Sequence, residues 1–195
     1  MAKKGLWRVR SKTDSKRWLL NRSQFAKNTL EYAIMEAALL GRGLSLLTST
    51  PADVLIIGIG SATIANFIQY HYHQSNITVL EERADVAHFL IDWFQIIPGP
   101  RLGIIVPDKQ EPLGTIIENQ DSKYHVVFYN MCPQSIASGS CPDERTLSEH
   151  IIRTMVKRVG DQGGFSPIDH IHTLTRLIEV SREYKMPLCR SRSST

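Results

Sequence analysis

Two glycines and a serine follow a short apolar run, and they are the first residues of the sequence that suggest chemistry. Residues 54–63 read VLIIGIGSAT, so Gly58, Gly60 and Ser61 come where a buried strand gives way to small residues. Glycine adopts positive φ at little cost and lets a ligand approach the main chain. The first turn of a following helix presents free N–H groups to the same space. The stretch therefore predicts a ligand-binding turn between a first strand and a first helix.

Two classes of ligand bind at such a turn. Dinucleotide-binding proteins carry G-x-G-x-x-G, in which the third glycine allows close packing of the helix beside a pyrophosphate. Thr63 stands at that third position here, so the match is incomplete. The other class is S-adenosylmethionine, whose amino-acid part, rather than a pyrophosphate, lies over the loop. The loop alone leaves both classes open.

Two carboxylates follow at the ends of the next two expected strands. Glu81 lies 23 residues after Gly58, where a carboxylate can accept both hydrogen bonds of a ribose diol. Asp108 ends the stretch IIVPD, within reach of an adenine amino group. The alternatives are a surface acid beside Glu82 and a turn residue after Pro107. An acid at the third strand is more typical of S-adenosylmethionine sites.

The elements that must position these residues alternate in type. A short continuous apolar run typical of a buried strand occurs at 53–59, and further strands are expected at 76–81, 101–108 and 124–130. Helical spacing of apolar residues occurs at 28–40, 62–73, 84–94 and 145–159, with a weaker helix at 111–120. This order predicts an α/β fold, Rossmann-like and doubly wound, with a mostly parallel sheet and helices on both faces.

Three local details sharpen this prediction. Asn28 is placed to cap the helix over 28–40, with Glu31 three residues on as in a capping box. Helical spacing turns Ile91 inward with the other apolar residues of 84–94. Near the C-terminus we expect a helix over 166–184 and a short strand at 186–189, so the sheet is shortened at its last strands.

Taken together, VLIIGIGSATIANFI, ITVLEERADVAHFL, RLGIIVPD and HVVFYN resemble the class I S-adenosylmethionine-dependent methyltransferase fold, and in particular its spermidine-synthase-like branch. The resemblance covers roughly residues 28–131. It implies S-adenosylmethionine as the cofactor and assigns roles by position. Gly58, Gly60 and Ser61 would contact its methionine part, Glu81 its ribose hydroxyls and Asp108 its adenine. Asn130, at the tip of the fourth strand, would face the reacting centre.

The chain also departs from that branch. Aminopropyltransferases of this type have an aspartate where Asn130 stands, and an amide orients an amine but cannot take its proton. His125 and Tyr129 are the nearby candidates for assisting a proton transfer. The small N-terminal β-domain of the branch has no counterpart in the first 52 residues. A shortened sheet would also expose an edge, which a second copy of the chain could cover.

Charge divides the chain into a basic arm and a mildly acidic body. Residues 1–27 hold nine Lys or Arg and one acid, whereas residues 28–195 hold 14 basic and 18 acidic residues. We expect a flexible arm over 1–27, a methyltransferase-type domain over 28–189 and a tail over 190–195. The arm could contact a phosphate-rich partner or act as a mitochondrial presequence. No apolar stretch is long enough for a transmembrane segment.

Cysteine and histidine spacing predicts no metal site. Cys132, Cys141 and Cys189 form no C-x-x-C pair, which favours reduced thiols, and we expect an intracellular, cytoplasmic protein. The H-x-H pairs 71/73 and 170/172 lie in expected helices, where alternate residues point about 200° apart. Neither pair is suited to chelating one ion.

Three functions are compatible with these residues. The first is methyl transfer from S-adenosylmethionine to an unidentified acceptor, which is a small molecule or a protein. The second is a non-catalytic relative that keeps the fold as a binding or scaffolding module, favoured by Asn130 and the shortened sheet. The third is an NAD-binding oxidoreductase, which Thr63 disfavours.

Overall fold

A four-stranded parallel sheet forms the centre of the protein in the computed structural model, which describes residues 7–8, 19–60, 62–108, 111, 113–120, 123–131 and 148–159. The strands stand in the order β5-β4-β3-β6. In chain order, the elements are β1 (Trp7–Arg8), β2 (Leu19–Leu20), α1 (Leu30–Leu40), β3 (Asp53–Ile57), α2 (Thr63–His71), β4 (Asn76–Leu80), α3 (Ala84–Phe94), β5 (Leu102–Ile105), α4 (Leu113–Glu118), β6 (Val126–Tyr129) and α5 (Glu149–Arg158).

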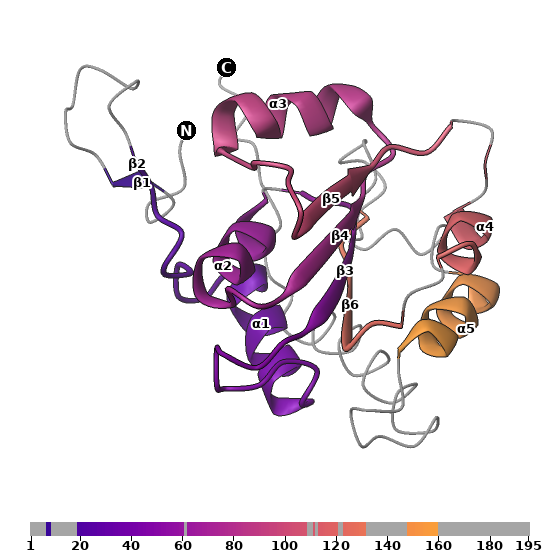
Figure 1. Cartoon of the computed structure of the whole chain (residues 1–195), viewed down its shortest axis with the longest axis horizontal. Coiled ribbons are helices and arrows are strands. Elements are labelled where there is room, and N and C mark those ends of the chain that lie inside the picture. The colour runs from indigo at the N-terminus through magenta and orange to yellow at the C-terminus, as the bar shows by residue number, and fades with distance from the viewer. Residues whose placement is uncertain are drawn as a thin grey trace, which may run out of the picture.

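Alternate residues of β3 explain why helices lie on both faces of the sheet. Val54 and Ile56 join the core that packs against α1, α2 and α3. Leu55 and Ile57 point the other way, into the core shared with α4 and α5. All four side chains are at most 1% exposed, and burying each contributes about 1.5–3 kcal/mol. Figure 1 shows α1 and α2 on one side of the sheet and α4 and α5 on the other.

The carboxyl ends of the strands are aligned by their register. Ile57 of β3 pairs with Leu80 of β4 on one side and with Tyr129 of β6 on the other. Leu80 pairs in turn with Ile105 of β5. The segments that follow these strands therefore leave the sheet at one edge, called here the carboxyl edge. The predicted parallel α/β sheet and all four of its strands are confirmed.

Two local predictions about helices are wrong. The N-cap of α1 is Thr29, whose hydroxyl accepts from the Tyr32 N–H at 3.3 Å. Asn28 has a φ of +62°, a left-handed conformation that asparagine tolerates in turns, so it precedes the cap. On α3, Ile91 is 37% exposed instead of inward. The inward stripe of α3 is narrower than helical spacing suggested.

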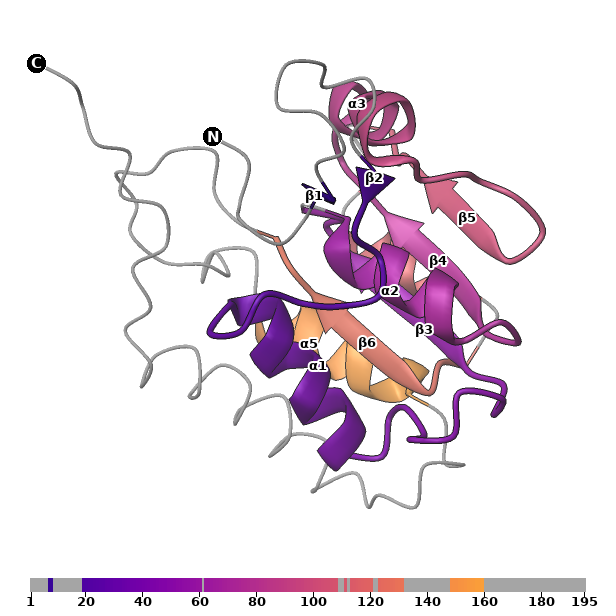
Figure 2. The same cartoon turned by 90° about the vertical axis from the view of Figure 1, so that its left-hand side faces the viewer.

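Residues 19–27 pack on the body, although the sequence assigned them to a flexible arm. The Arg22 guanidinium donates to Gln95 at the end of α3, at 3.0 Å to its carbonyl oxygen and 3.0 Å to its Oε1. The ring of Phe25 lies 4.4 Å from that of Phe67 on α2. Charge density alone predicted an arm, but this segment also carries apolar side chains that the body buries. Figure 2 shows it running from β2 past α2 to α1.

The chain returns to the sheet at Val159, next to the start of β6. A parallel bridge joins Val159 to Tyr124, and the Tyr124 N–H donates to the Arg158 carbonyl at 2.7 Å. The helix expected at 166–184, the strand at 186–189 and all three cysteines lie outside the described residues. None of the described helices has the length and apolarity needed to cross a bilayer.

Candidate functional site

The turn after β3 has the backbone conformation that its glycines predict. Gly58 has a φ of +78° and Gly60 a φ of +56°. The Gly58 N–H donates to the Leu80 carbonyl at 2.8 Å, which keeps the turn attached to β4. Ala62 also has a positive φ of +57° and occupies the N-cap position of α2. Its methyl side chain cannot accept a hydrogen bond, so the first turn of α2 is not capped by its own N-cap side chain.

The Glu81 carboxylate closes this turn from the neighbouring strand. Its Oε2 accepts the Ile59 N–H at 3.1 Å, and its Oε1 accepts the Arg83 N–H at 3.1 Å. The residue is only 7% exposed. A buried carboxylate needs such partners because desolvation of an unpaired charge is costly. Each oxygen keeps a lone pair, so the group can still accept from a ligand hydroxyl.

Asn130 lies against the glycine turn from the other neighbouring strand. Its backbone N–H donates to the Ile57 carbonyl at 2.7 Å. A Cβ added at Gly60 would stand 2.3 Å from Asn130 Nδ2, and one at Gly58 would stand 2.8 Å from the Asn130 carbonyl oxygen. The glycines therefore make room for Asn130 itself. Gly58 is buried in this packing, whereas Gly60 is exposed, so an approach of a ligand to the main chain stays a prediction for Gly60.

Sequence reasoning missed Met131, which also packs on the turn. Its Sδ would lie 3.0 Å from a Cβ at Gly58. Its place directly after Asn130 at the end of β6 was the one signal that could have identified it. A thioether at this position adds an apolar wall beside the polar groups of Glu81 and Asn130.

The carboxyl edge gathers some of the predicted site residues and leaves others apart. Gly58, Gly60, Glu81 and Asn130 form the cluster described above. Asp108 lies further along the same edge, three residues beyond β5, and is exposed. Its carbonyl accepts the N–H of Glu111 at 3.0 Å. Ser61 lies outside the described residues.

Two carboxyl groups that follow β4 at this edge have shifted pKa values: the hydrogen bond from Arg83 lowers the pKa of Asp85, whereas the pKa of Glu82 is raised. Partial burial raises the pKa of Glu82, and the adjacent charge of Glu81 raises it further. A carboxyl whose pKa is raised favours its neutral form, so Glu82 can donate a hydrogen bond over a wider pH range than an ordinary glutamate.

His125 is at the wrong end of its strand to assist proton transfer at this site. The Asp53 N–H donates to His125 Nδ1 at 2.9 Å, and the His125 N–H donates to the Asp53 carbonyl at 2.8 Å. Asp53 begins β3, so His125 lies at the edge opposite the glycine turn. Tyr129, which ends β6 at the carboxyl edge, remains in place for such a role.

The two histidines of the described H-x-H pair have different surroundings. His71 Nε2 lies 3.1 Å from the Ser23 carbonyl, to which it can donate, and the centroid of the His71 ring lies 4.4 Å from that of Phe67, with the two rings tilted by 47°. His73 is exposed beyond the end of α2. Among the residues that the structure describes, no three His, Cys, Asp or Glu side chains gather as metal ligands would.

Solved structures share this fold. The chain superposes on human methyltransferase-like protein 13 in complex with SAH with a TM-score of 0.56, at 19% identity, over 66% of this chain and 59% of that one. It superposes on a probable spermidine synthase from Corynebacterium glutamicum with a TM-score of 0.52, at 18% identity, over 67% of this chain and 43% of that one. The chain has the class I methyltransferase fold.

Part of the chain is also similar in sequence to curated proteins named as methyltransferases. The eEF1A lysine and N-terminal methyltransferase of Xenopus laevis is 22% identical over 121 residues, which is 62% of this chain and 18% of that protein. Its mouse counterpart is 22% identical over 111 residues, or 56% and 16% of the two chains. This chain thus spans less than a fifth of the length of these relatives. No profile of a known protein family matches it.

Proposed function

We propose that the carboxyl edge of the sheet binds S-adenosylmethionine and that the protein transfers its methyl group to an acceptor. The observation that carries this proposal is the contact of the buried Glu81 carboxylate with the Ile59 N–H at 3.1 Å. It fixes an acid of the second sheet strand beside a glycine turn. The carboxylate closes the turn with these backbone contacts, and the lone pairs that they leave suit the hydroxyls of a ribose diol.

The residues at this edge fit the parts of the cofactor. Gly58, Gly60 and Ser61 would hold the methionine part, whose carboxylate suits the N–H groups at the start of α2. Glu81 would accept from the ribose hydroxyls with the lone pairs that the backbone contacts leave. Asp108, exposed beyond β5, would accept from the adenine amino group.

The chain's own contribution to the reaction is alignment. The bound cofactor supplies a sulfonium methyl group, which an acceptor atom displaces in line. Asn130, held by the Ile57 carbonyl and the glycine turn, would orient the acceptor with its amide. Met131 beside it would exclude water from the acceptor side. Fixing two reactants in this way accounts for a large part of the rate enhancement in such reactions.

An amine is the acceptor class to test first. The curated relatives are named as lysine and N-terminal methyltransferases, and both of those acceptors are amino groups. An amide such as Asn130 can accept a hydrogen bond from an attacking amine through Oδ1. The acceptor of this chain is therefore proposed to be a protein amino group, with a small-molecule amine as the alternative.

Calorimetry with S-adenosylmethionine and its demethylated product tests cofactor binding. We expect saturable binding of both, which Glu81→Ala abolishes. Asp92→Ala on the exposed side of α3 removes a similar charge away from the site and should leave the affinity unchanged. Absence of binding at millimolar cofactor would refute the proposal, and binding of NAD instead would indicate the oxidoreductase alternative.

A non-catalytic binding module is the second candidate, because Asn130 cannot take a proton from an amine. Transfer of a tritiated methyl group from the cofactor to a lysine-containing peptide or to an amine separates the two. If the protein is an enzyme, Asn130→Ala lowers the transfer rate with little change in cofactor affinity. Cofactor binding without transfer to any acceptor supports the module.

Further partners and the location of the protein are also proposals. The charge of residues 1–18 suits a phosphate-rich partner, and salt-sensitive binding of nucleic acid would support that idea. A second copy is proposed to cover an open edge of the sheet, which the mass in solution tests. We place the protein inside the cell, in the cytoplasm or, if the basic arm is a presequence, in mitochondria.

A further inference from the structure

A hollow lies at the edge of the sheet opposite the glycine turn. Its volume is about 640 Å³, and it is lined by residues at the ends of α4 and α5 and by one residue before β6, namely Glu118, Lys123, Thr154, Lys157 and Arg158. We call it the α4–α5 hollow. Small-molecule sites have volumes of about 300–1,000 Å³. Because α4 and α5 both end at the edge where β6 begins, the hollow is separate from the proposed cofactor site.

The side chains of the α4–α5 hollow carry excess positive charge. Three of its five lining residues are Lys or Arg and one is Glu. The Glu118 carboxylate accepts from the Thr154 hydroxyl at 3.2 Å and lies 3.7 Å from His150 Nε2. Its charge is thus engaged by α5. The hollow thus differs in sign of charge from the body as a whole, since residues 28–195 hold 14 basic and 18 acidic residues.

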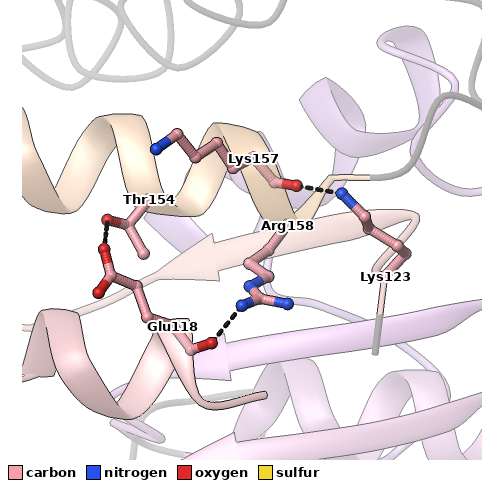
Figure 3. A pocket seen from close by; sticks show the side chains of 5 residues that line it. All are labelled: Glu118, Lys123, Thr154, Lys157 and Arg158. Atoms are coloured by element: carbon pink, nitrogen blue, oxygen red, sulfur yellow. Dashed lines mark hydrogen bonds between the residues drawn. The ribbon is translucent and has the colours of Figure 1, made fainter. Parts of the chain in front are cut away.

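Two of the cations are held in place by backbone carbonyls. Lys123 Nζ donates to the Lys157 carbonyl at 2.5 Å, and an Arg158 guanidinium nitrogen donates to the Glu118 carbonyl. Figure 3 shows the Arg158 guanidinium between Glu118 and Lys123, and the Lys157 side chain running back along α5 toward Thr154, which also lines the hollow. These bonds give hydrogen-bond donors to carbonyls at the C-terminal ends of α4 and α5.

Helix capping uses only part of the donor capacity of this cluster. A guanidinium has five N–H donors and an ammonium has three. One bond from each to a carbonyl leaves four donors on Arg158 and two on Lys123. Lys157 contributes its charge without capping either helix. Charged donors that are already fixed in position bind an anion at a smaller entropic cost than free ones.

We infer that the α4–α5 hollow binds a small phosphorylated molecule through its phosphate groups. Arginine and lysine together are the side chains that recognise phosphate, arginine through its planar fork and lysine as a point charge. Their surplus of positive charge matches a phosphate dianion or a pyrophosphate. The volume of the hollow favours a small molecule over an extended polymer. The inference does not depend on the proposed methyl transfer.

A calorimetric titration of the full chain with inorganic pyrophosphate tests this site. We expect saturable binding. Lys157→Gln keeps both capping bonds, because only its backbone carbonyl takes part in one of them, and it should weaken binding about tenfold, as expected for loss of one charged contact. Lys123→Gln should weaken binding to a similar extent, although it also removes the ammonium that donates to the Lys157 carbonyl. The thermal midpoint of each variant checks that the protein is folded.

Arg153→Gln is the matched control. It removes the same charge from α5, but Arg153 pairs with Glu149 at 2.7 Å instead of lining the hollow. Its pyrophosphate affinity should stay within twofold of the parent. Equal weakening by Arg153→Gln and Lys157→Gln would overturn the proposal in favour of diffuse attraction, and so would absence of saturable binding at millimolar pyrophosphate. Binding of single-stranded RNA but not pyrophosphate, lost in Lys157→Gln, would also overturn it.

Discussion

The amide nitrogen of Asn130 occupies the space that a side chain at Gly60 would need. A Cβ at Gly60 would stand 2.3 Å from Asn130 Nδ2, closer than real Cβ contacts come. The carboxyl ends of β3 and β6 thus pack against each other here, where the Asn130 N–H also donates to the Ile57 carbonyl. The position of the acceptor-side residue and the shape of the cofactor turn depend on each other.

Gly60→Ala should therefore destabilise the protein by about 2–4 kcal/mol, from a left-handed φ and a steric clash together. Adding Asn130→Ala removes the clash and should recover part of the loss, because the strain at φ remains. Urea unfolding of both variants measures this. Gly103→Ala is the control, since a Cβ there meets nothing within 4 Å. Equal stability of Gly60→Ala and Gly103→Ala would contradict the contact.

Glu81→Ala should lower the free energy of unfolding by about 2–4 kcal/mol, because the Ile59 and Arg83 N–H groups lose their acceptor. Glu81→Gln should cost less, since its amide oxygen can accept one of the two. Both should bind the cofactor poorly. Unfolding in urea together with calorimetry distinguishes these effects, and an unchanged midpoint for Glu81→Ala would show that the carboxylate does not close the turn.

The raised pKa of Glu82 predicts a specific pH dependence of stability. Because folding favours its neutral form, ionisation of Glu82 destabilises the native state. The wild type should lose stability relative to Glu82→Gln as the pH rises from about 4.5, the reference pKa, through the folded-state pKa, and the difference should then stay constant. Thermal midpoints of the two proteins between pH 4 and 7 test this. A wild type that gains stability relative to the variant over this range would reverse the sign of the shift.

His125→Ala should separate stability from function. It removes the acceptor of the Asp53 N–H and should cost about 1 kcal/mol. At a temperature where both the variant and the wild type are folded, the two proteins should have the same cofactor affinity and the same rate of any methyl transfer. Loss of transfer with unchanged stability would place His125 at the site after all. Tyr129→Phe is the comparison at the carboxyl edge, where an effect on transfer is expected.

Phe25→Ala tests whether residues 19–27 belong to the folded body. Loss of its ring from the Phe67 contact should lower stability by about 1–2 kcal/mol. Leu46→Ala is the control, because Leu46 is 81% exposed and its truncation should change stability by less than about 0.5 kcal/mol. Equal effects of the two variants on stability would show that residues 19–27 are part of the arm and not of the folded body.

The sequence predicted those parts of the fold that a single stretch of chain determines. The run VLII is buried on both faces of the sheet, so it identified β3 directly. The predicted N-cap of α1 was wrong by one residue. Both Asn28 and Thr29 are of types that cap helices, and the backbone conformation of Asn28 decides between them. The prediction that Ile91 points inward was wrong because helical spacing gives the direction of the buried apolar stripe but not its width.

The candidate site shows a similar boundary. Gly58, Gly60 and Glu81 follow strands, and parallel strands end at one edge, so their proximity could be predicted. The filling of the Gly60 side-chain space by Asn130 could not, because it depends on the register between β3 and β6. The mispositioning of His125 has the same origin, since being near Asn130 in sequence does not place a residue at the same end of the strand.

The double pairing of β3, with β4 on one side and β6 on the other, has a consequence for local opening. Amides of Leu55 and Ile56 should exchange with solvent only when the whole domain unfolds, whereas amides of β5, which pairs with a strand on one side only among the described residues, should exchange through smaller fluctuations. The glycine turn thus follows β3, whose hydrogen bonds break last, whereas Asp108 follows β5, whose hydrogen bonds break more easily. A ligand spanning both would reveal itself by slowing exchange around β5 far more than in β3.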